Sequence, residues 1–415
     1  MSILIKKVLL NNEAVDIYIE GNIIKKIGGS LNFKAETNID GSEKAAIPSF
    51  FNAHTHAAMT LMRGYADDMG LESWLKTKIW PLEAKLTEED VYWGARLACL
   101  EMIKSGTTFF NDMYWHFHGT AKAAEEMGLR AAISAVFIDN FDRKKTREQI
   151  EFNEKLFTES KKYSERIIFA LGPHAIYTVS EESLEWIKFF ADKNNLLIHI
   201  HLSETENEVK KSVKKYGLRP VEYLEKINFL GPNIIACHSI WLNETEIEIL
   251  SSHNVKIVYN PVSNMKLGSG IFPYEKMKRK LNIMLGTDGC ASNNNLDMLE
   301  AMKIGALLQK IKSKKPDVLA AEEVFNIATI NGARAFNINS GEIKEGKLAD
   351  LLLINLKNIA LNPRHNLISN LVYSANGNCV DTTICDGKIL MQNRKVVGEE
   401  EIIKKANQTA LNLVE

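Results

Sequence analysis

Residues 48–56 read Pro-Ser-Phe-Phe-Asn-Ala-His-Thr-His, an apolar run that ends in His54 and His56. Residues two apart on a β-strand point to the same side, so both imidazoles are able to reach one cation. Imidazole is a common ligand of zinc and of similar divalent metals. A single His-x-His pair is a weak signal, because many such pairs are incidental, so its meaning depends on the rest of the chain.

Three further polar motifs also stand at the ends of apolar runs. They are His199-Ile-His-Leu-Ser-Glu204, Cys237-His238-Ser239 and Gly286-Thr-Asp-Gly289. Together with the His-x-His pair they supply imidazole and carboxylate groups, which are the ligands that divalent metals prefer in enzymes. The pattern therefore predicts a metal site assembled from several strands.

The composition narrows the class of protein and the partners to expect. Of 415 residues 45% are hydrophobic and 25% are charged, and the net charge is −1. This balance predicts a small-molecule substrate and no nucleic-acid or membrane surface. Five cysteines without paired spacing indicate a reducing compartment, and the sequence shows neither a signal peptide nor a run of 18 apolar residues. We therefore expect a cytoplasmic protein.

The middle of the chain alternates apolar, strand-like runs with helical patterns. The clearest helical pattern begins at Thr87, with Asp90 three residues later as a capping box, and Gly106 stands just past its end. The strand-like runs cover residues 45–51, 107–111, 130–137, 166–172, 196–202, 234–237, 256–260 and 282–286. Eight strands that alternate with helices predict an α/β fold of the (β/α)₈ TIM barrel type.

Both ends of the chain read as short strands that are too few to bury a core alone. Residues 3–28 contain strand patterns joined by a Gly-Asn turn. Residues 349–354 and 382–391 also contain strand patterns. The economical arrangement packs the two ends together. We expect a small β-sandwich domain from residues 1–47 and 345–415, with a barrel from residues 48–344 inserted between them.

The barrel makes a prediction about chemistry, because active sites of this fold lie at the C-terminal ends of the strands. The candidate groups follow strands one, five, six and eight, so all of them converge on one mouth. These groups are His54, His56, His201, Glu204, His238 and Asp288.

With these motifs in place, the chain resembles the amidohydrolase superfamily. It looks closest to the branch that contains methylthioadenosine/S-adenosylhomocysteine deaminases, guanine deaminases and s-triazine hydrolases. The matching stretches are Pro48–His56, Trp80–Glu83, Ser105–Thr108, Gly172–His174, His199–Glu204, Cys237-His238, Asn260–Asn264, Gly286–Gly289 with Ser292–Asn294, and Gly346–Asp350. There are two departures: Ser49 stands where the family usually has Gly, and Ala135 stands where relatives often carry an Arg on strand three.

The metal ligands expected from these motifs surround one divalent ion, with zinc as the first choice, and are His54, His56, His201 and Asp288. No Lys stands at the end of strand four to bridge a second metal, so we expect a mononuclear site. The resemblance implies that Glu204 protonates a ring nitrogen while Asp288 accepts a proton from the attacking water. We expect His238 to stabilise the charge that develops during the reaction.

Substrate-binding roles follow mainly from the resemblance. Glu83 and His174 match positions that bind the ribose and the far side of the substrate, Ser292 is close enough to Asp288 to contact substrate, and Arg147 is a candidate second Arg. His199 reads as structural. In addition, Trp115, Phe117, His116 and His118 are expected near the pocket, and Glu206 and Glu208 on the solvated surface.

The resulting hypothesis is a hydrolytic deaminase that replaces an aromatic amine of a purine nucleoside and releases ammonia. The lead substrates are 5′-methylthioadenosine, S-adenosylhomocysteine and 5′-deoxyadenosine, a choice that rests on the resemblance. Guanine or another aromatic base, or an s-triazine, stays open as the alternative substrate class. A non-catalytic scaffold that kept the fold is a third hypothesis. Proteins of this family commonly form dimers or tetramers, which leaves a homo-oligomer open.

Overall fold

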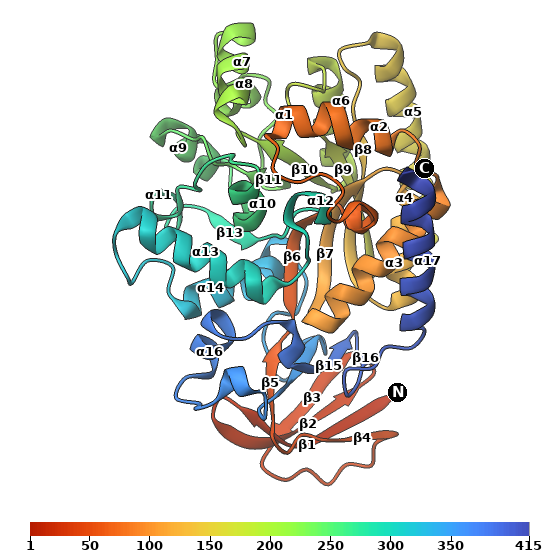
Figure 1. Ribbon diagram of the computed structural model, residues 1–415, viewed down its shortest axis with the longest axis vertical. Coiled ribbons are helices and arrows are strands. Elements are labelled where there is room, and N and C mark those ends of the chain that lie inside the picture. Colours follow the sequence, from red (N-terminus) through yellow and green to blue (C-terminus); the bar gives the residue numbers. More distant parts are fainter. Residues whose placement is uncertain (415) are drawn as a thin grey trace.

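The structure is a computed structural model that describes residues 1–414 (Figure 1). Eight parallel strands of the middle of the chain form one sheet in which each strand pairs with its sequence neighbour. These strands are β6 (Phe50–Thr55), β7 (Thr107–Tyr114), β8 (Arg130–Phe137), β9 (Ile167–Pro173), β10 (Leu197–Leu202), β11 (Ile234–His238), β12 (Lys256–Tyr259) and β13 (Asn282–Leu285). The expectation of a parallel eight-stranded barrel is confirmed as a nearly closed one.

One expected strand divides between two sheets. The apolar run at 45–51 contains the end of β5 (Lys44–Pro48), which pairs with C-terminal strands, and the start of β6, the first barrel strand. Ser49 lies between them, where its hydroxyl bonds that of Thr108 at 2.5 Å. The apolar character is continuous because both strands are buried, so the sequence shows no break there.

Helices cover the outside of the barrel. The predicted capping box is present at α3 (Glu88–Ser105), where Thr87 and Asp90 bond each other's backbone, and Gly106 ends the helix at φ 95°. The helices that follow are α4 (Phe117–Met127), α5 (Arg143–Ser160), α6 (Glu181–Asn194), α7 (Glu206–Tyr216), α8 (Pro220–Lys226), α9 (Glu244–Ser252), α10 (Pro261–Lys266), α11 (Tyr274–Met277), α12 (Cys290–Asn293), α13 (Met298–Ser313), α14 (Ala321–Ile327) and α15 (Ile330–Ala335).

The two ends of the chain meet, as the sequence predicts, and their strands form one second sheet where a β-sandwich was expected. Its strands run in the order β16-β15-β14-β5-β1-β2-β3, and β4 pairs with β1. The bounds are β1 (Ser2–Leu10), β2 (Glu13–Glu20), β3 (Ile23–Gly28), β4 (Thr37–Asp40), β14 (Leu351–Asn355), β15 (Val380–Cys385) and β16 (Lys388–Met391). Figure 1 shows this sheet at the end of the barrel from which β6 starts.

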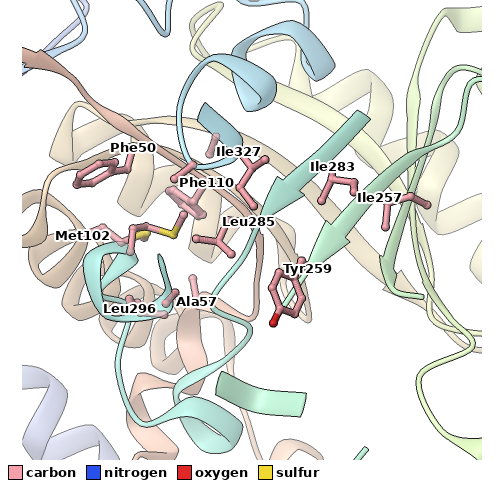
Figure 2. Close-up of a cluster of buried hydrophobic side chains, with 14 of the residues drawn as sticks. Phe50, Ala57, Met102, Phe110, Ile257, Tyr259, Ile283, Leu285, Leu296 and Ile327 are labelled. Atoms are coloured by element: carbon pink, nitrogen blue, oxygen red, sulfur yellow. The ribbon is translucent and has the colours of Figure 1, made fainter. Parts of the chain in front are cut away.

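A continuous apolar core joins the two sheets. Phe50 and Phe110 of the barrel belong to the same buried cluster as Leu352 and Val380 of the second sheet. Figure 2 shows the barrel side of this cluster, where Tyr259, Leu285 and Ile327 lie with Phe110. A buried ion pair adds to the contact, because Arg130 Nε lies 3.1 Å from Asp350 Oδ2.

The last two long helices pack on the barrel although one lies between strands of the second sheet in sequence and the other follows its last strand. Helix α16 (Leu367–Tyr373) contacts α13 and α14, and α17 (Glu399–Val414) lies along α3 (Figure 1). Residues 345–415 are therefore shared between the two parts of the molecule.

None of the helices within residues 1–414 is long and apolar enough to cross a membrane.

A helical segment after β6 crosses the C-terminal end of the barrel. It comprises η1 (Ala57–Met62), α1 (Leu71–Trp74), η2 (Leu75–Ile79) and α2 (Trp80–Glu83). Glu72 fastens this segment to α7, because its Oε2 accepts hydrogen bonds from Asn207 at 2.9 Å and from Lys211 at 3.0 Å. The segment thereby covers the mouth in which the candidate groups lie (Figure 1).

Candidate active site

Four candidate ligands converge at the C-terminal end of the barrel. His54 Nε2 and His56 Nε2 each lie 3.3 Å from Asp288 Oδ1, and His201 Nε2 lies 3.4 Å from His56 Nε2. His54 is in β6, His201 is in β10, and Asp288 follows β13. The barrel therefore brings together four side chains from three strand ends that are far apart in sequence.

Each histidine is oriented by a bond to its other ring nitrogen. His56 Nδ1 donates to the carbonyl oxygen of Met113 at 2.6 Å, and His201 Nδ1 donates to that of His174 at 2.8 Å. His54 Nδ1 lies 2.8 Å from His199 Nε2. Because a neutral imidazole carries one proton, the bonds to carbonyl oxygens leave the Nε2 lone pairs of His56 and His201 free to bind a metal, whereas the bond between His54 and His199 is compatible with either nitrogen as the donor.

The donor set fits a divalent metal of the zinc type. His54 Nε2 is buried and has no hydrogen-bond partner among residues 1–414, as expected of an atom whose partner is an ion. Burial lowers the pKa of His54 to about 4 and that of His201 well below its usual value, so both imidazoles are neutral ligands at pH 7. Three imidazoles and one carboxylate match zinc in ligand type.

Two further titratable groups face this cluster. Glu204 Oε2 lies 3.9 Å from His238 Nε2, and Ser269 donates a hydrogen bond to Glu204 Oε1 at 3.1 Å. Burial, together with the negative charge of Asp288, raises the pKa of Glu204 to about 8. Burial lowers the pKa of His238 to about 4. At pH 7 the site therefore offers a protonated carboxyl and a neutral imidazole side by side.

A pocket opens from the cluster beneath the covering segment. Glu83, His174 and Ser292 line it, as the resemblance implies, together with Trp115. Glu83 Oε2 accepts a hydrogen bond from Trp115 Nε1 at 3.1 Å, and burial raises the pKa of Glu83. The opposite wall is apolar and includes Leu71, Trp74, Val136, Ile138 and Leu267.

Arg147 does not belong to this pocket. It is exposed on α5, whose buried face carries Thr146 and Asn153 instead. Ala135 also points away from the pocket, because it packs in the outer core between the barrel and its helices, whereas Val136 lines the pocket. The pocket wall at the third barrel strand is therefore apolar whatever residue occupies position 135.

Glu208 lies in a place that differs from the prediction of a solvated side chain. It is 5% exposed, and its carboxylate accepts hydrogen bonds from the backbone N–H groups of Ser203 and Glu204, both at 2.8 Å. Glu206 is exposed, as predicted. The Glu208 carboxylate therefore supports the strand end that carries Glu204.

The two histidines predicted near the pocket lie outside it. His116 Nε2 bonds the carbonyl oxygen of Leu86 at 2.9 Å, and His118 bonds Glu159 and Tyr163 on the barrel's outer side. Phe117 is part of the hydrophobic core. Of this predicted group, only Trp115 reaches the pocket.

This architecture has relatives among known proteins. Residues 45–390 match the amidohydrolase family. The chain belongs to this family. It is 50% identical to a protein of Archaeoglobus fulgidus named 5-methylthioadenosine/S-adenosylhomocysteine deaminase 1, over 96% of this chain and 95% of that protein. It is 47% identical to a protein of Methanocaldococcus jannaschii named 5′-deoxyadenosine deaminase, over 98% of each.

A solved structure of the family shares the whole architecture. It is an adenosine deaminase from Xanthomonas campestris with bound zinc. This amidohydrolase superposes on it with a TM-score of 0.93 at 32% identity, over 99% of this chain and 98% of the other. Barrel, covering segment and second sheet are therefore common to both.

Proposed function

We propose that this amidohydrolase removes the amino group of a purine nucleoside modified at the 5′ position by hydrolysis. The substrates are 5′-methylthioadenosine, S-adenosylhomocysteine or 5′-deoxyadenosine, and the products are ammonia and the inosine analogue. The observation that carries the proposal is the position of Glu204 Oε2, 3.9 Å from His238 Nε2 and beside a metal-type donor set. The names of relatives at 47–50% identity support the substrate class.

In this proposal His54, His56, His201 and Asp288 hold one divalent ion, with zinc as the first choice. Such an ion, when bound, polarises a water molecule and lowers the pKa of that water towards neutrality. The Nδ1 bonds of His56 and His201 to carbonyl oxygens fix their tautomers for this role, and His54 has the same tautomer when its Nδ1 donates to His199.

The proton transfers are assigned to the two carboxyl groups. Glu204, protonated at pH 7, donates its proton to the ring nitrogen beside the carbon that bears the amino group. Asp288 accepts a proton from the attacking water: the neighbouring His54 outweighs the effect of burial and holds the pKa of Asp288 well below the usual value, so the group is ionised at pH 7 and has a free oxygen to accept the proton. His238 Nε2–H donates to the oxygen on which negative charge develops.

The remaining pocket residues bind the nucleoside in this proposal. Glu83 is half-buried beside Trp115 and accepts hydrogen bonds from ribose hydroxyls. His174 is held by Thr178 through its Nδ1 at 2.9 Å, which leaves Nε2 directed at the substrate. Ser292 Oγ, 3.1 Å from Asp288 Oδ2, lies at the amine end of the pocket.

A base-only or triazine substrate is the alternative from the sequence, and the relatives' names favour the nucleoside over it. The scaffold hypothesis has less support, because the full donor set and Glu204 converge in one pocket.

Ammonia release by the zinc-loaded protein tests the proposal. The panel contains adenosine, 5′-methylthioadenosine, S-adenosylhomocysteine, 5′-deoxyadenosine, guanine and an aminated s-triazine, with Glu204→Gln as the control. We expect release from the nucleosides, lost in the variant. Release from guanine or the triazine alone would contradict the substrate class while leaving the metal site intact.

A further inference from the structure

One connection of the barrel contacts all three groups that the proposed chemistry uses for proton transfer and charge stabilisation. This connection, residues 260–270, leaves β12 and contains α10. Ser263 Oγ donates to Asp288 Oδ2 at 2.6 Å, Asn264 Nδ2 donates to His238 Nδ1 at 2.8 Å, and Ser269 Oγ donates to Glu204 Oε1 at 3.1 Å.

The sheet order explains why this connection reaches all three. Glu204 follows β10, His238 ends β11 and Asp288 follows β13, while β12 lies between β11 and β13. A segment that leaves β12 at the C-terminal end of the barrel therefore enters the space among them. The resemblance implies no role for the motif Asn260–Asn264, and its position among these three groups suggests one.

The bond from Asn264 fixes the tautomer of His238. Because the amide of Asn264 donates to Nδ1, that nitrogen is the acceptor of the neutral ring, and the ring proton must be on Nε2. The amide nitrogen of Asn260 lies 3.4 Å from the same Nδ1 and favours the same tautomer. Nε2 faces Glu204, so the donor N–H is directed into the pocket.

Each carboxyl group uses one oxygen for the connection and presents the other to the site. Asp288 binds Ser263 through Oδ2, and its Oδ1 faces His54 and His56. Glu204 binds Ser269 through Oε1, and its Oε2 faces His238. The two hydroxyls therefore contribute to the rotation of both carboxyl groups; on Asp288 they act together with Ser292 Oγ, which donates to Oδ2 at 3.1 Å, and the Gly289 N–H, which donates to Oδ1 at 2.8 Å.

The connection is itself held in place. The N–H of Ser269 donates to the carbonyl oxygen of Asn264 at 2.9 Å, and Trp241 Nε1 donates to the carbonyl oxygen of Ser269 at 2.6 Å. Gly270, at φ 130°, lets the chain pass Ile240, where a Cβ would come within 2.9 Å of the Ile240 side chain. Ser269 is thus anchored at both backbone groups next to a position that favours glycine.

We propose, on the basis of the deaminase function above, that Ser263, Asn264 and Ser269 are positioning residues. They act as a unit: the connection sets the rotation of Asp288, the tautomer of His238 and the rotation of Glu204 before substrate arrives. The three side chains act through these groups and do not themselves contact the reacting atoms.

Steady-state kinetics of zinc-loaded variants test whether Ser263, Asn264 and Ser269 position these groups. We expect Ser263→Ala, Asn264→Leu and Ser269→Ala each to lower kcat by about 10–100-fold, with KM and zinc content close to those of the unchanged protein. Ser263→Thr keeps the hydroxyl and should recover most of the rate. Met265→Ala is the matched control on the same helix, because Met265 is half exposed and lies outside the pocket. Equal kcat in all variants would overturn the proposal.

Nitrogen NMR of isotopically labelled histidine gives a readout that does not depend on activity. We expect the His238 signal, identified by its loss in His238→Gln, to show Nδ1 without a proton and Nε2 with one. In Asn264→Asp the donor becomes an acceptor, so the proton should move onto Nδ1. An Nδ1–H tautomer in the unchanged protein would overturn the proposal. If no nucleoside is deaminated, the proposed function fails, while this experiment still decides the tautomer.

Discussion

The backbone N–H of Asp288 donates a hydrogen bond to the carbonyl oxygen of His54 at 2.9 Å. This bond joins the first and last barrel strands, β6 and β13, which are the two ends of the hydrogen-bonded strand order. Asn52 and Thr287 reinforce the seam with side-chain bonds at 2.6 and 3.0 Å. Two proposed ligands are therefore held relative to each other by hydrogen bonds that do not involve a metal, so we expect the site to persist without one.

Removal of the metal should abolish activity but leave the barrel folded. We expect chelation to stop ammonia release and zinc to restore it. Because binding to the native state alone stabilises it, zinc at a concentration on the order of 100 times its Kd should add about 3 kcal/mol to the free energy of unfolding. Thermal unfolding with and without zinc measures this. Loss of the circular dichroism signal on chelation would contradict a preformed site.

Glu208 should contribute to both stability and rate. Glu208→Ala leaves the N–H groups of Ser203 and Glu204 without their acceptor, which costs about 1–3 kcal/mol for each group. Ser203 lies at φ 48°, a conformation that few non-glycine residues adopt, so the loss should also release the strand end that carries Glu204. Urea unfolding and kcat measure the two effects.

Glu206→Ala is the matched control for this prediction. Glu206 is exposed and pairs with Lys210 at 2.8 Å, and such surface pairs contribute about 0–1 kcal/mol. If Glu208→Ala were as stable and as active as Glu206→Ala, the two backbone bonds would have no role in positioning Glu204.

The pH dependence should report the proton on Glu204. Burial, with the charge of Asp288, raises the pKa of Glu204 to about 8, so the group is protonated below that pH and loses its proton above it. A general acid must carry its proton, so kcat/KM should fall as the pH rises through this pKa. A bound cation favours the carboxylate, which makes pH 8 the upper limit of the midpoint. In Glu204→Gln the fall of kcat/KM at high pH should disappear. If the fall persisted in this variant, it would have to be assigned to another titrating group.

The metal-type residues could be predicted from the sequence because they depend on simple rules. His54 and His56 lie on one side of a strand because side chains two residues apart point the same way. The motifs of β10, β11 and β13 lie at the same mouth because the C-terminal ends of the strands of a parallel barrel meet there. The capping box of α3 was predicted for the same reason, since its residues are close in sequence.

Other features depend on geometry that the sequence does not show. β8 is buried on both faces, so its apolar residues show no alternation to reveal that Val136 faces inward and Ala135 outward. Glu208 looks like an ordinary acidic residue in the first turn of α7. Its burial follows from the left-handed backbone at Ser203, which turns two N–H groups towards it.

Glu83 should separate nucleosides from free bases. If its carboxylate accepts hydrogen bonds from ribose hydroxyls, Glu83→Gln should raise KM for 5′-deoxyadenosine by about 10–100-fold, the equivalent of about 1.5–3 kcal/mol for bonds to a charged group. The effect on kcat should be smaller. Trp115→Phe, which removes the N–H donor to Glu83, should show a weaker effect of the same kind. An unchanged KM would show that the ribose does not contact Glu83.

The charge of the pocket should decide among the three nucleosides. Among residues 1–414 no Lys or Arg side chain lines it; its acidic side chains are Glu83, Asp288 and the protonated Glu204, and most of the remaining lining is apolar. A carboxylate in such a pocket loses hydration without gaining a cationic side chain, and it is repelled by the acidic groups that are ionised. We therefore expect kcat/KM for S-adenosylhomocysteine to be at least about tenfold below that for 5′-methylthioadenosine, which corresponds to about 1.4 kcal/mol.

The decarboxylated analogue of S-adenosylhomocysteine isolates the cause, because it keeps the length and the amino group of the side chain and lacks only the carboxylate. If the carboxylate is what the pocket disfavours, kcat/KM for the analogue should return towards that for 5′-methylthioadenosine. Equal values for all three substrates would instead mean that the 5′ substituent leaves the pocket beneath the covering segment and reaches solvent. The contacts of Glu72 with Asn207 and Lys211 would then have to open for each such substrate, and kcat/KM for the longer substrates alone should rise in Glu72→Gln.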